Sequence, residues 1–395
     1  MTKVAVIGGG AAGFFYAINK AIFDPKAQII IYEQSKNVLN KVRISGGGRC
    51  NVTHACFDPR ELVQSYPRGS KELLGPFNSF ACGDTIAWFD ERGIELKIEE
   101  DGRMFPITDS SQTIIDCFIS ECERLNIKIK TQCKVKNLIL KEDRKCQIDT
   151  TEGQEVFDQV FLGTGSSPFF WNILKNLGHH IVDPVPSLFT FNIKDKSINN
   201  LPGISVPNAI VTIPEFKLEA DGPLLITHWG LSGPAILKLS AWGARTLEQC
   251  NYKFSICIDW IPLISDEEIE MYKNSLGGKF IKDKNPFKLP NRLWQNLISD
   301  TSFQNKRWAD LTKIELAELI SMLKNRAYSV NGKSTFKAEF VTAGGVDLRE
   351  VNFKDFSSKI LPNLYLAGEV INIDAITGGF NFQAAWTGSY LASKA

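Results

Sequence analysis

Apolar and polar residues along the first third of the chain form the pattern of an α/β protein. An apolar strand at 4–7 leads into glycines and a helical segment, and a second apolar strand follows at 28–33. The segment 93–106 carries the turn dipeptide Asp101–Gly102 and predicts a hairpin. Capping residues followed by apolar residues near helical spacing predict a helix at 108–125. The pattern therefore predicts strands and helices in alternation.

The pattern changes near residue 185. Before this point, four short strands are expected, at 127–131, 135–140, 146–150 and 156–162. Beyond it, residues rich in Pro, Gly and β-branched side chains predict strands at 188–193, 209–213, 224–227 and 252–258. The segment 265–327 is polar and helical instead, and Thr312 with Glu315 has the spacing of a capping box.

We therefore expect an interrupted nucleotide-binding domain with an insertion. The expected parts are a first nucleotide-binding segment, a β-rich domain, a helical insertion, a return strand of the β-rich domain and a second nucleotide-binding segment, at 1–185, 186–262, 263–327, 328–341 and 342–395.

The glycine turn after the first strand is the strongest local signal. Gly8 permits a tight turn, Gly10 lets backbone approach a pyrophosphate, and Gly13 lets the helix pack close to the strand. The anion would lie on the N–H groups at the helix N-terminus. Glu33 ends the second strand 20 residues after Gly13, where a carboxylate can accept adenosine ribose hydroxyls. FAD or NAD therefore fits better than NADP, whereas a tight turn that binds nothing is the alternative.

Composition narrows the classes of protein. The 395 residues are enough for two or three domains, and the hydrophobic fraction of 44% with 23% charged residues is ordinary for a globular protein. Lys and Arg number 45 against 44 Asp and Glu, so the formal charge of +1 provides no global field for nucleic acid or anionic lipid. We therefore do not expect nucleic acid as a partner, although a local basic groove stays compatible with this charge.

Compartment and metal content also follow from the sequence. The nucleotide strand follows Met-Thr-Lys at once and no apolar run approaches the roughly 20 residues of a membrane span, so we expect a cytoplasmic protein with no membrane partner. The nine cysteines are odd in number and form no Cys-x-x-Cys pair. With only four histidines, we expect neither a disulfide framework nor a metal site.

Two further glycine segments indicate a flavin. A strand ends at Gly368–Glu369, and Gly378–Gly379 opens a helix whose N–H groups and partial positive charge can face a pyrimidine edge that becomes negative on reduction. The alternative is a terminal strand and helix that only complete the sheet. The segment 41–53 adds three glycines with Ser45, Arg49 and Asn51, a suitable environment for phosphate or a flavin edge.

These segments together resemble the BaiN/RdsA-type family of bacterial FAD-dependent oxidoreductases, also called YhiN-like or aminoacetone oxidase-like flavoproteins. The resemblance covers nearly the whole chain and depends on the blocks Gly8-Gly-Gly-Ala-Ala-Gly13, Ile44-Ser-Gly-Gly-Gly-Arg-Cys-Asn-Val-Thr53, Gly102-Arg-Met-Phe-Pro106, Thr227-His-Trp-Gly-Leu-Ser-Gly-Pro234, Thr342-Ala-Gly-Gly-Val346 and Ala367-Gly-Glu369 through Gly378-Gly-Phe-Asn381. It implies an α/β fold: a glutathione-reductase-type, Rossmann-like FAD domain interrupted by a β-barrel-like domain and a small helical domain.

The resemblance also implies where FAD binds. Its expected contacts are Gly8, Gly10, Ala11, Ala12, Gly13, Glu33, Gln34, Lys41, Ser45, Gly46, Gly47, Arg49, Cys50, Asn51, Val135, Thr164, Gly165, Gly368, Glu369, Gly378, Gly379, Asn381 and Phe382. Two departures matter. The family commonly has Tyr where this chain has Phe380, which removes a hydroxyl near the flavin, and Asn where it has His54.

Catalytic residues are less well defined, because flavin chemistry does not require a protein acid or base. The candidates are His228, which could titrate near neutral pH, Cys50, whose thiol pKa a nearby cation could lower, and Arg49, which could clamp an anion. Each has a structural alternative: a histidine held by hydrogen bonds, an inert buried cysteine and a solvated surface arginine. The glycines in 342–346 either bring backbone close to the flavin or form a simple turn.

The expected activity is hydride transfer between flavin N5 and a small organic substrate. One version is a reductase driven by NAD(P)H, which would bind transiently because no second strand-led Gly-x-Gly-x-x-Gly unit is present. The alternatives are an oxidase of a small amine or hydroxy compound that uses oxygen and, less favoured, a flavin-dependent RNA-modifying enzyme. The sequence leaves the substrate and the oligomeric state open.

Overall fold

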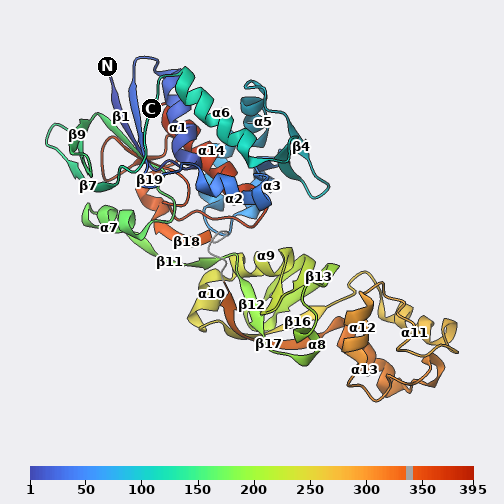
Figure 1. Cartoon of the computed structure of the whole chain (residues 1–395). Helices are drawn as coiled ribbons and strands as arrows, with labels where there is room; N and C mark the ends of the chain where they lie inside the picture. The colour runs from blue at the N-terminus through green and yellow to red at the C-terminus, as the bar shows by residue number, and fades with distance from the viewer. Residues whose placement is uncertain (335–340) are drawn as a thin grey trace. The chain divides into compact units, whose positions relative to one another are not determined.

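The computed structural model describes residues 1–334 and 341–395. The chain divides into two compact units (Figure 1). Unit 1 comprises Met1–Val185 and Val341–Ala395, and unit 2 comprises Pro186–Phe340. Each unit has its own cluster of buried apolar side chains.

Unit 1 is built on a seven-stranded sheet with the order β19-β20-β21-β10-β1-β2-β6. Five neighbouring strands are parallel: β21 (Leu364–Leu366), β10 (Gln159–Leu162), β1 (Lys3–Ile7), β2 (Gln28–Tyr32) and β6 (Lys128–Lys130). The edge strands β20 (Ser357–Ser358) and β19 (Val351–Asn352) are antiparallel. The carboxyl ends of the parallel strands therefore share one edge, where α/β sheets bind ligands.

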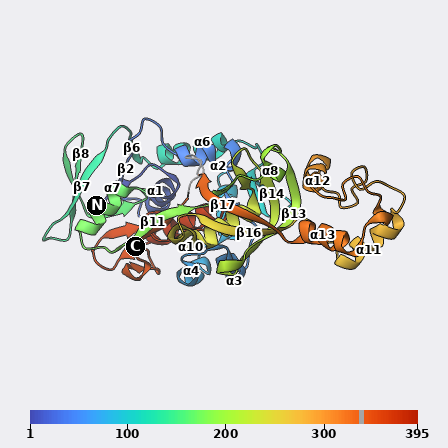
Figure 2. The ribbon, with the colours of Figure 1, turned by 90° about the horizontal axis from the view of Figure 1, so that it is seen from below.

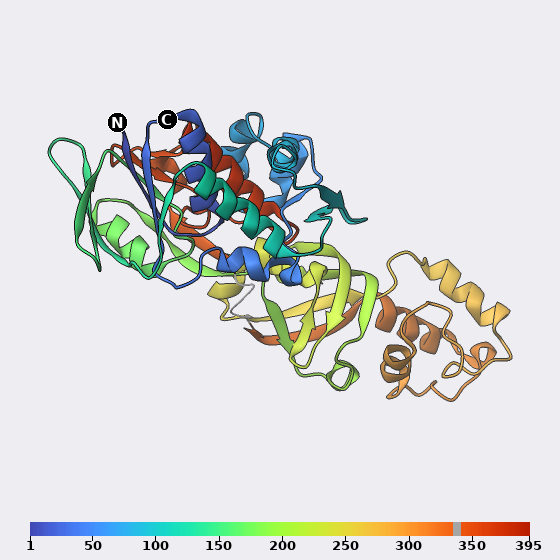
Figure 3. The same ribbon diagram turned by 45° about the horizontal axis from the view of Figure 1, so that its top comes forward.

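Helices cover one side of this sheet and a three-stranded antiparallel sheet lies on the other (Figures 1 and 3). The helices are α1 (Ala11–Phe23), α6 (Ser111–Arg124) and α14 (Phe380–Ser393), and the strands are β7 (Val135–Leu140), β8 (Cys146–Thr150) and β9 (Gln154–Phe157). Helix α1 is buried without interruption from Ala12 to Ala21, because the sheet and α14 both pack on it.

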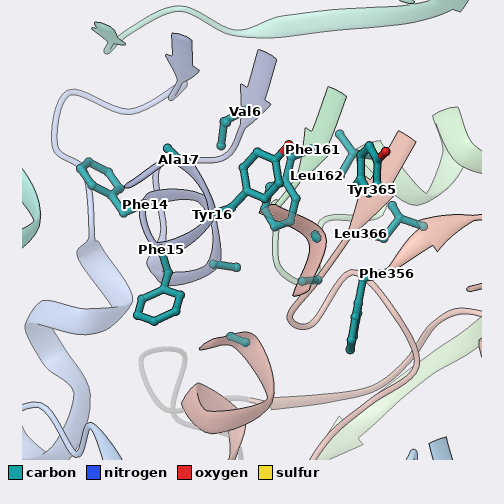
Figure 4. Close-up of a cluster of buried hydrophobic side chains, with 14 of the residues drawn as sticks. Val6, Phe14, Phe15, Tyr16, Ala17, Phe161, Leu162, Phe356, Tyr365 and Leu366 are labelled. Atoms are coloured by element: carbon teal, nitrogen blue, oxygen red, sulfur yellow. The ribbon is translucent and has the colours of Figure 1, made fainter. Parts of the chain in front are cut away.

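The side chains of α1 join the sheet and α14 in one core (Figure 4). Tyr16 stacks on Phe161 of β10 with ring centroids 4.1 Å apart. On another side of the helix, Phe15 packs against Trp88 at 4.6 Å and Trp386 at 5.0 Å. These aromatic contacts fix α1, and therefore its first turn, relative to the ends of the strands.

The remaining elements of unit 1 lie outside the two sheets described above, and some of them form two smaller sheets, β3-β5-β4 and β11-β18. They are α2 (Asn40–Gly48), β3 (Thr53–His54), α3 (Pro59–Leu62), η1 (Val63–Ser65), α4 (Ser70–Phe77), α5 (Cys82–Asp90), β4 (Leu96–Ile98), β5 (Arg103–Pro106), α7 (Pro168–Asn176), β11 (Ile181–Ser187), β18 (Val341–Val346) and η4 (Leu348–Glu350). The predicted hairpin is confirmed, since β4 and β5 are antiparallel neighbours. The predicted helix at 108–125 is also confirmed, beginning at Ser111 with a cap from the Ser110 hydroxyl.

One strand prediction is wrong. The apolar run 156–162 is not one strand, because it divides between β9 and β10 in different sheets. Asp158 lies at the break, and its carboxylate accepts the N–H of Lys3 at 2.8 Å. The segment 41–53 also differs from a plain loop, since it begins inside α2.

Unit 2 contains a closed six-stranded barrel with the order β12-β15-β14-β13-β16-β17 (Figure 2). Its strands are β12 (Thr190–Ile193), β13 (Ser205–Ile213), β14 (Leu218–Ile226), β15 (Gly230–Ser232), β16 (Lys253–Asp259) and β17 (Arg326–Ser334). The short elements α8 (Lys196–Asn199), η2 (Pro214–Phe216), α9 (Pro234–Trp242) and α10 (Ala244–Gln249) accompany it. The predicted β-barrel-like part is therefore present.

The helical part of unit 2 consists of α11 (Asp266–Ser275), α12 (Asn291–Ile298), η3 (Trp308–Asp310) and α13 (Lys313–Lys324). The predicted capping box at Thr312 and Glu315 is confirmed. Of the return strand expected at 328–341, residues 328–334 belong to β17, and residues 335–340 lie outside the described residues.

A membrane span needs a long apolar helix. No helix in the described part of the chain combines that length with that apolar character.

Candidate functional site

The glycine turn between β1 and α1 is shaped by three different spatial constraints. Gly8 has φ +107°, and a Cβ there would lie 2.4 Å from the Gly163 carbonyl oxygen. A Cβ on Gly13 would lie 2.0 Å from the Gly8 carbonyl oxygen. A Cβ on Gly10, in contrast, would meet no described atom within 4 Å. Two glycines therefore allow close packing of the chain, and the third leaves open space at the start of α1.

The start of α1 can receive an anion. Gly10 is its N-cap, and among the described residues no side chain caps this end and no acidic residue lies in the first turn. The first N–H groups of a helix have no carbonyl partner within the helix, and they carry a partial positive charge. Ala11 and Ala12 supply such groups beside the open space at Gly10.

The Glu33 carboxylate is held at the same edge of the sheet. It accepts the N–H of Gly9 at 3.0 Å and the N–H of Ser35 at 2.8 Å, one on each oxygen. Each carboxylate oxygen can accept a second hydrogen bond. The carboxylate is therefore oriented by the glycine turn and still able to accept ribose hydroxyls.

Two neighbouring segments complete this side. The N–H of Cys133 donates to the Glu33 carbonyl at 2.9 Å, which places the buried Val135 on the segment next to Glu33, whereas Gln34 is exposed. After β10, Thr164 has a buried hydroxyl oxygen with no hydrogen-bond partner among the described residues. An unpartnered buried hydroxyl beside a glycine turn fits a site that a polar ligand completes.

The C-terminal segment meets this glycine turn. A Cβ built on Gly368 would lie 3.5 Å from the Ala12 methyl of α1 and 3.9 Å from the Ala385 methyl of α14. The next residue, Glu369, accepts a hydrogen bond from the Lys41 ammonium at 2.7 Å. A small pocket lies between this segment and α14, lined by Gly368, Glu369, Ile371, Ile373, Asn381 and Ala384.

The start of α14 is fixed by close contacts with the chain. A Cβ on Gly379, whose φ is +94°, would lie 2.6 Å from backbone atoms of Thr53. His54 Nδ1 donates to the Gly378 carbonyl at 3.0 Å, and its ring stacks on Phe380 at 4.4 Å. Burial lowers the pKa of His54, and the hydrogen bond to Gly378 opposes that shift. His54 and Phe380, the two residues at which the resemblance implies a departure from the family, therefore lie in direct contact.

The glycine loop that begins inside α2, where Ser45, Gly46 and Gly47 leave the helical conformation, has an unusual backbone. Gly46, Gly47, Gly48 and Cys50 all have positive φ, between +57° and +88°. No described atom would lie within 4 Å of a Cβ on Gly47 or Gly48. Successive N–H groups in such turns can form an anion-binding concavity. The loop therefore offers backbone donors beside open space.

The family of the chain is shown by comparison with known proteins. Residues 2–395 match the HI0933-like protein Rossmann domain. The chain belongs to this family. The membership confirms the predicted relationship and the Rossmann fold, and it identifies an enzyme of the FAD-dependent oxidoreductase class, as the sequence predicts.

Two curated relatives of this HI0933-like chain align along almost its whole length. A ribosomal RNA dihydrouridine synthase of Haemophilus influenzae is 29% identical over 98% of this chain and 96% of the relative. A 3-dehydro-bile acid delta(4,6)-reductase of Clostridium scindens is 27% identical over 100% of this chain and 99% of the relative. Among solved structures, a 3-ketosteroid-delta4-(5alpha)-dehydrogenase from Rhodococcus jostii RHA1 shares the fold, with a TM-score of 0.52, 10% identity, and coverage of 100% and 97%.

The catalytic candidates Arg49 and Cys50 are both engaged by the protein. Arg49 pairs with Glu99 at 2.5 Å and Asp109 at 3.4 Å, and its guanidinium lies 3.9 Å from the Phe105 ring centroid. Two carboxylates and an aromatic ring therefore hold its guanidinium, and the role of Arg49 as an anion clamp stays a prediction. Burial raises the pKa of the Cys50 thiol to about 12, so the expected lowering by a neighbouring cation is absent.

The third candidate, His228, belongs to unit 2 and is exposed, as is its neighbour Trp229. The turn that carries them is held by the chain itself, because the Thr227 N–H donates to the Gly230 carbonyl at 2.8 Å. His228 is therefore an exposed residue of unit 2, and its catalytic role stays a prediction.

Several predicted contact residues use their side chains to hold the loops. The Ser45 hydroxyl donates to the Val42 carbonyl at 2.8 Å, and the Asn51 carbonyl oxygen accepts the Met104 N–H at 3.3 Å. The Asn381 amide bonds both the N–H and the carbonyl of Ala375, at 3.0 and 3.3 Å. Phe382 stacks on Trp386 in α14, and Gly165 has φ +60° in its turn.

The glycines of 342–346 pack against backbone. A Cβ on Gly344 would lie 2.6 Å from Cα of Pro184, and a Cβ on Gly345 would lie 2.6 Å from the Val370 carbonyl oxygen. Their small size therefore lets β18 (Val341–Val346) pass between two other segments of the chain.

Other residues that shape the site gave no signal in the sequence. Tyr66 donates its hydroxyl to the Phe380 carbonyl at 2.6 Å, and Arg68 forms an ion pair with the fully buried Asp374. More than 300 residues separate the members of each pair, so no local spacing could reveal them. Gly9 is absent from the predicted FAD contacts, although it lies inside the glycine motif and its N–H donates to the Glu33 carboxylate.

Proposed function

We propose that the chain holds FAD along the edge formed by β1, β2, β10 and the start of α14, and reduces a carbon–carbon double bond conjugated with a carbonyl group. The proposal joins the glycine turn, Glu33, Thr164 and the C-terminal helix in one cofactor site. NAD(P)H is the proposed electron donor, bound transiently.

The position of Gly368 is the observation that carries this proposal. Its neighbours are Ala12 in the first turn of α1 and Ala385 in α14. An elongated dinucleotide placed with its pyrophosphate at the start of α1 could therefore extend along Gly368 toward α14. A mononucleotide would leave one of the two uncapped helix starts, at Gly10 and Gly379, without a ligand.

The proposed roles of the residues follow from their contacts. Ala11 and Ala12 bind the pyrophosphate through backbone N–H groups, and Glu33 accepts the adenosine ribose hydroxyls. Thr164 supplies a hydroxyl that has no hydrogen-bond partner within residues 1–334 and 341–395. Glu369 is oriented by Lys41 and is available to a ribityl hydroxyl.

FAD held by these residues would, once reduced, supply a hydride for the β-carbon of the conjugated bond, and solvent would supply the proton for the α-carbon. The uncapped start of α14 favours negative charge on a group placed against it, because its first N–H groups have no helical acceptor. His54 and Tyr66 keep this start in place through Gly378 and Phe380.

The substrate class is inferred from what the relatives have in common. The bile acid enzyme is named as a delta(4,6)-reductase of a 3-dehydro compound, and dihydrouridine is uridine with its C5=C6 bond reduced. Both bonds are conjugated with a carbonyl group. The same chemistry therefore fits two candidate acceptors for this chain, a small enone and, as the alternative, a uracil base within RNA.

The test is anaerobic reduction and reoxidation of the purified holoprotein. We expect bound FAD to lose its yellow colour on mixing with NADPH or NADH and to regain it when a cyclic enone is added, with formation of the saturated ketone. A colourless protein that cannot be loaded with FAD would refute the cofactor assignment. Reoxidation by oxygen together with an amine substrate, but not by enones, would instead favour the oxidase alternative.

A further inference from the structure

The helical part of unit 2 carries an exposed basic surface with an aromatic ring in it. Residues 276–292 contain five Lys and Arg residues and one acid, Asp283. Lys279, Phe280, Lys282 and Arg307 form what we call the basic–aromatic patch, and all four are exposed. The charge of the whole chain hides this local excess, partly because α11 begins with acidic residues.

Backbone pairing brings the patch together from two distant segments. The Ile281 N–H donates to the Lys306 carbonyl at 3.0 Å, and the Trp308 N–H donates to the Lys279 carbonyl at 3.0 Å. Phe280 and Arg307 form an antiparallel bridge between these bonds. The buried Trp308 anchors one of the two segments in the apolar core of unit 2. The patch is therefore mounted on a fixed pair of segments.

The aromatic ring is exposed and accompanied by cations. Phe280 retains 40% of its accessible surface, which is high for a large apolar side chain. The Arg307 guanidinium lies 5.4 Å from its ring centroid, and the Lys282 ammonium lies 5.9 Å from it. An exposed ring flanked by cations can stack on a base while the cations contact phosphates.

The patch cations are not neutralised within the described part of the chain. Lys279, Lys282 and Arg307, as well as the neighbouring Lys284, form no ion pair with any described acidic side chain, and Lys282 donates to the Asn305 side-chain oxygen at 3.1 Å. Neighbouring Lys306 differs, since it pairs with Glu315 at 2.8 Å. Lys279, Lys282, Lys284 and Arg307 therefore carry four positive charges, against the two exposed carboxylates of Asp283 and Asp310.

We infer that the basic–aromatic patch binds the phosphate backbone and an unpaired base of RNA. This inference rests on the proposed reduction of a conjugated double bond, because a uracil base is such an acceptor. Cations alone would suit any polyanion, but the exposed Phe280 ring adds a surface on which an unpaired base can stack.

The test is binding of a fluorescein-labelled RNA hairpin with a uridine-rich loop to the full-length holoprotein, by fluorescence anisotropy at several KCl concentrations. We expect binding that weakens with salt. The triple variant Lys279→Gln, Lys282→Gln, Arg307→Gln should raise Kd at least about tenfold and lower the salt slope by about 2. Phe280→Leu should raise Kd about fivefold without changing the slope.

A matched control removes the same charge elsewhere. Lys26→Gln, Lys71→Gln, Lys175→Gln changes three exposed lysines of unit 1, and we expect it to retain RNA affinity within about twofold. Equal losses in the two triple variants, or no RNA binding by the unchanged protein at low salt, would overturn the inference. So would equal competition by polyglutamate with no effect of Phe280→Leu, which would indicate an acidic protein partner.

Flavin reduction by NADPH and turnover of a small enone are measured on the same samples. Normal flavin reduction and enone turnover without RNA binding would refute the inference that the basic–aromatic patch binds RNA, and would leave the proposed function unchanged. RNA binding without flavin reduction would refute the proposed function and support the patch.

Discussion

The starts of α1 and α14 use glycine for opposite purposes. Both helices begin after a glycine N-cap, and no described side chain caps either one. At Gly10 a Cβ would meet no described atom within 4 Å, whereas at Gly379 it would lie 2.6 Å from the Thr53 backbone. Gly10 therefore leaves space that a ligand can occupy, whereas Gly379 allows the Thr53 backbone to pass close to the start of α14.

Because of this difference, substitutions at the two helix starts should affect different properties of the protein, the stability of the fold at α14 and the binding of the cofactor at α1. Substitutions at the start of α14 should act on the fold, because its neighbours are backbone atoms and buried hydrogen bonds. Substitutions at the start of α1 should act on the cofactor. The following predictions are ordered from the largest expected effect to the smallest.

Gly379→Ala should lower the free energy of unfolding by about 3 kcal/mol, because the new Cβ collides with Thr53 and alanine is strained at φ +94°. Urea denaturation measures the loss. Gly83→Ala is the matched control, since Gly83 lies in α5, a new Cβ there would meet only Phe57 Cδ1 at 3.9 Å beyond its chain neighbours, and alanine favours the helix, so stability should rise by up to about 1 kcal/mol. Equal effects of the two substitutions would contradict the comparison.

Gly10→Ala should weaken FAD binding by about 10- to 100-fold, because a methyl group would occupy the space proposed for the pyrophosphate. Titration of the apoprotein with FAD measures this loss. The unfolding free energy of the apoprotein should change by about 1 kcal/mol or less, since φ is −100° at this position. Unchanged FAD affinity would show that the pyrophosphate lies elsewhere.

Glu33→Gln should weaken FAD binding about tenfold. The amide keeps the size of the side chain but has one acceptor oxygen, so it cannot accept from both Gly9 and Ser35 and also hold ribose hydroxyls. The same FAD titration gives the result. The control is Glu100→Gln, an exposed carboxylate, and it should bind FAD as the unchanged protein does.

Acidification should weaken the start of α14 through His54. Its pKa is lowered by burial, so the folded state binds fewer protons than the unfolded state below about pH 6.5. Stability should therefore fall as the pH falls from 6.5 toward the folded pKa. Asp101 and Arg103 are the charged groups that face the ring, with opposite effects on its pKa.

His179 is also buried and also has a lowered pKa. The experiment therefore compares the unchanged protein with the His54→Asn variant across the same pH range. Between pH 7.5 and pH 5, urea denaturation should show a smaller loss of unfolding free energy for His54→Asn than for the unchanged protein. Identical losses would assign the pH dependence to His179 or other groups.

The sequence predicted features that depend on nearby residues. The glycine turn, Glu33, the hairpin at 93–106 and the Thr312 capping box all follow from short spacings. The division of the run 156–162 could not be predicted, because it depends on a hydrogen bond between Asp158 and the distant Lys3 backbone. Periodicity contains no information about such a partner.

Local sequence patterns also could not predict contacts between residues that lie far apart in the chain. Lys41 and Glu369 were each predicted to contact FAD, but their ion pair joins residues 328 positions apart. Arg49 was expected as an anion clamp, and only the fold brings Glu99 and Asp109 to it. Net charge averaged over the chain similarly concealed Lys279 and Arg307, which become neighbours through backbone pairing.

The contact of Gly368 with Ala12 has a consequence for biosynthesis. During translation the amino-terminal turn leaves the ribosome first, while α14 and the segment before it are made last. The proposed FAD cradle is incomplete until both have emerged. Cofactor uptake should therefore be a post-translational event, and nascent chains halted before residue 368 should not retain the flavin.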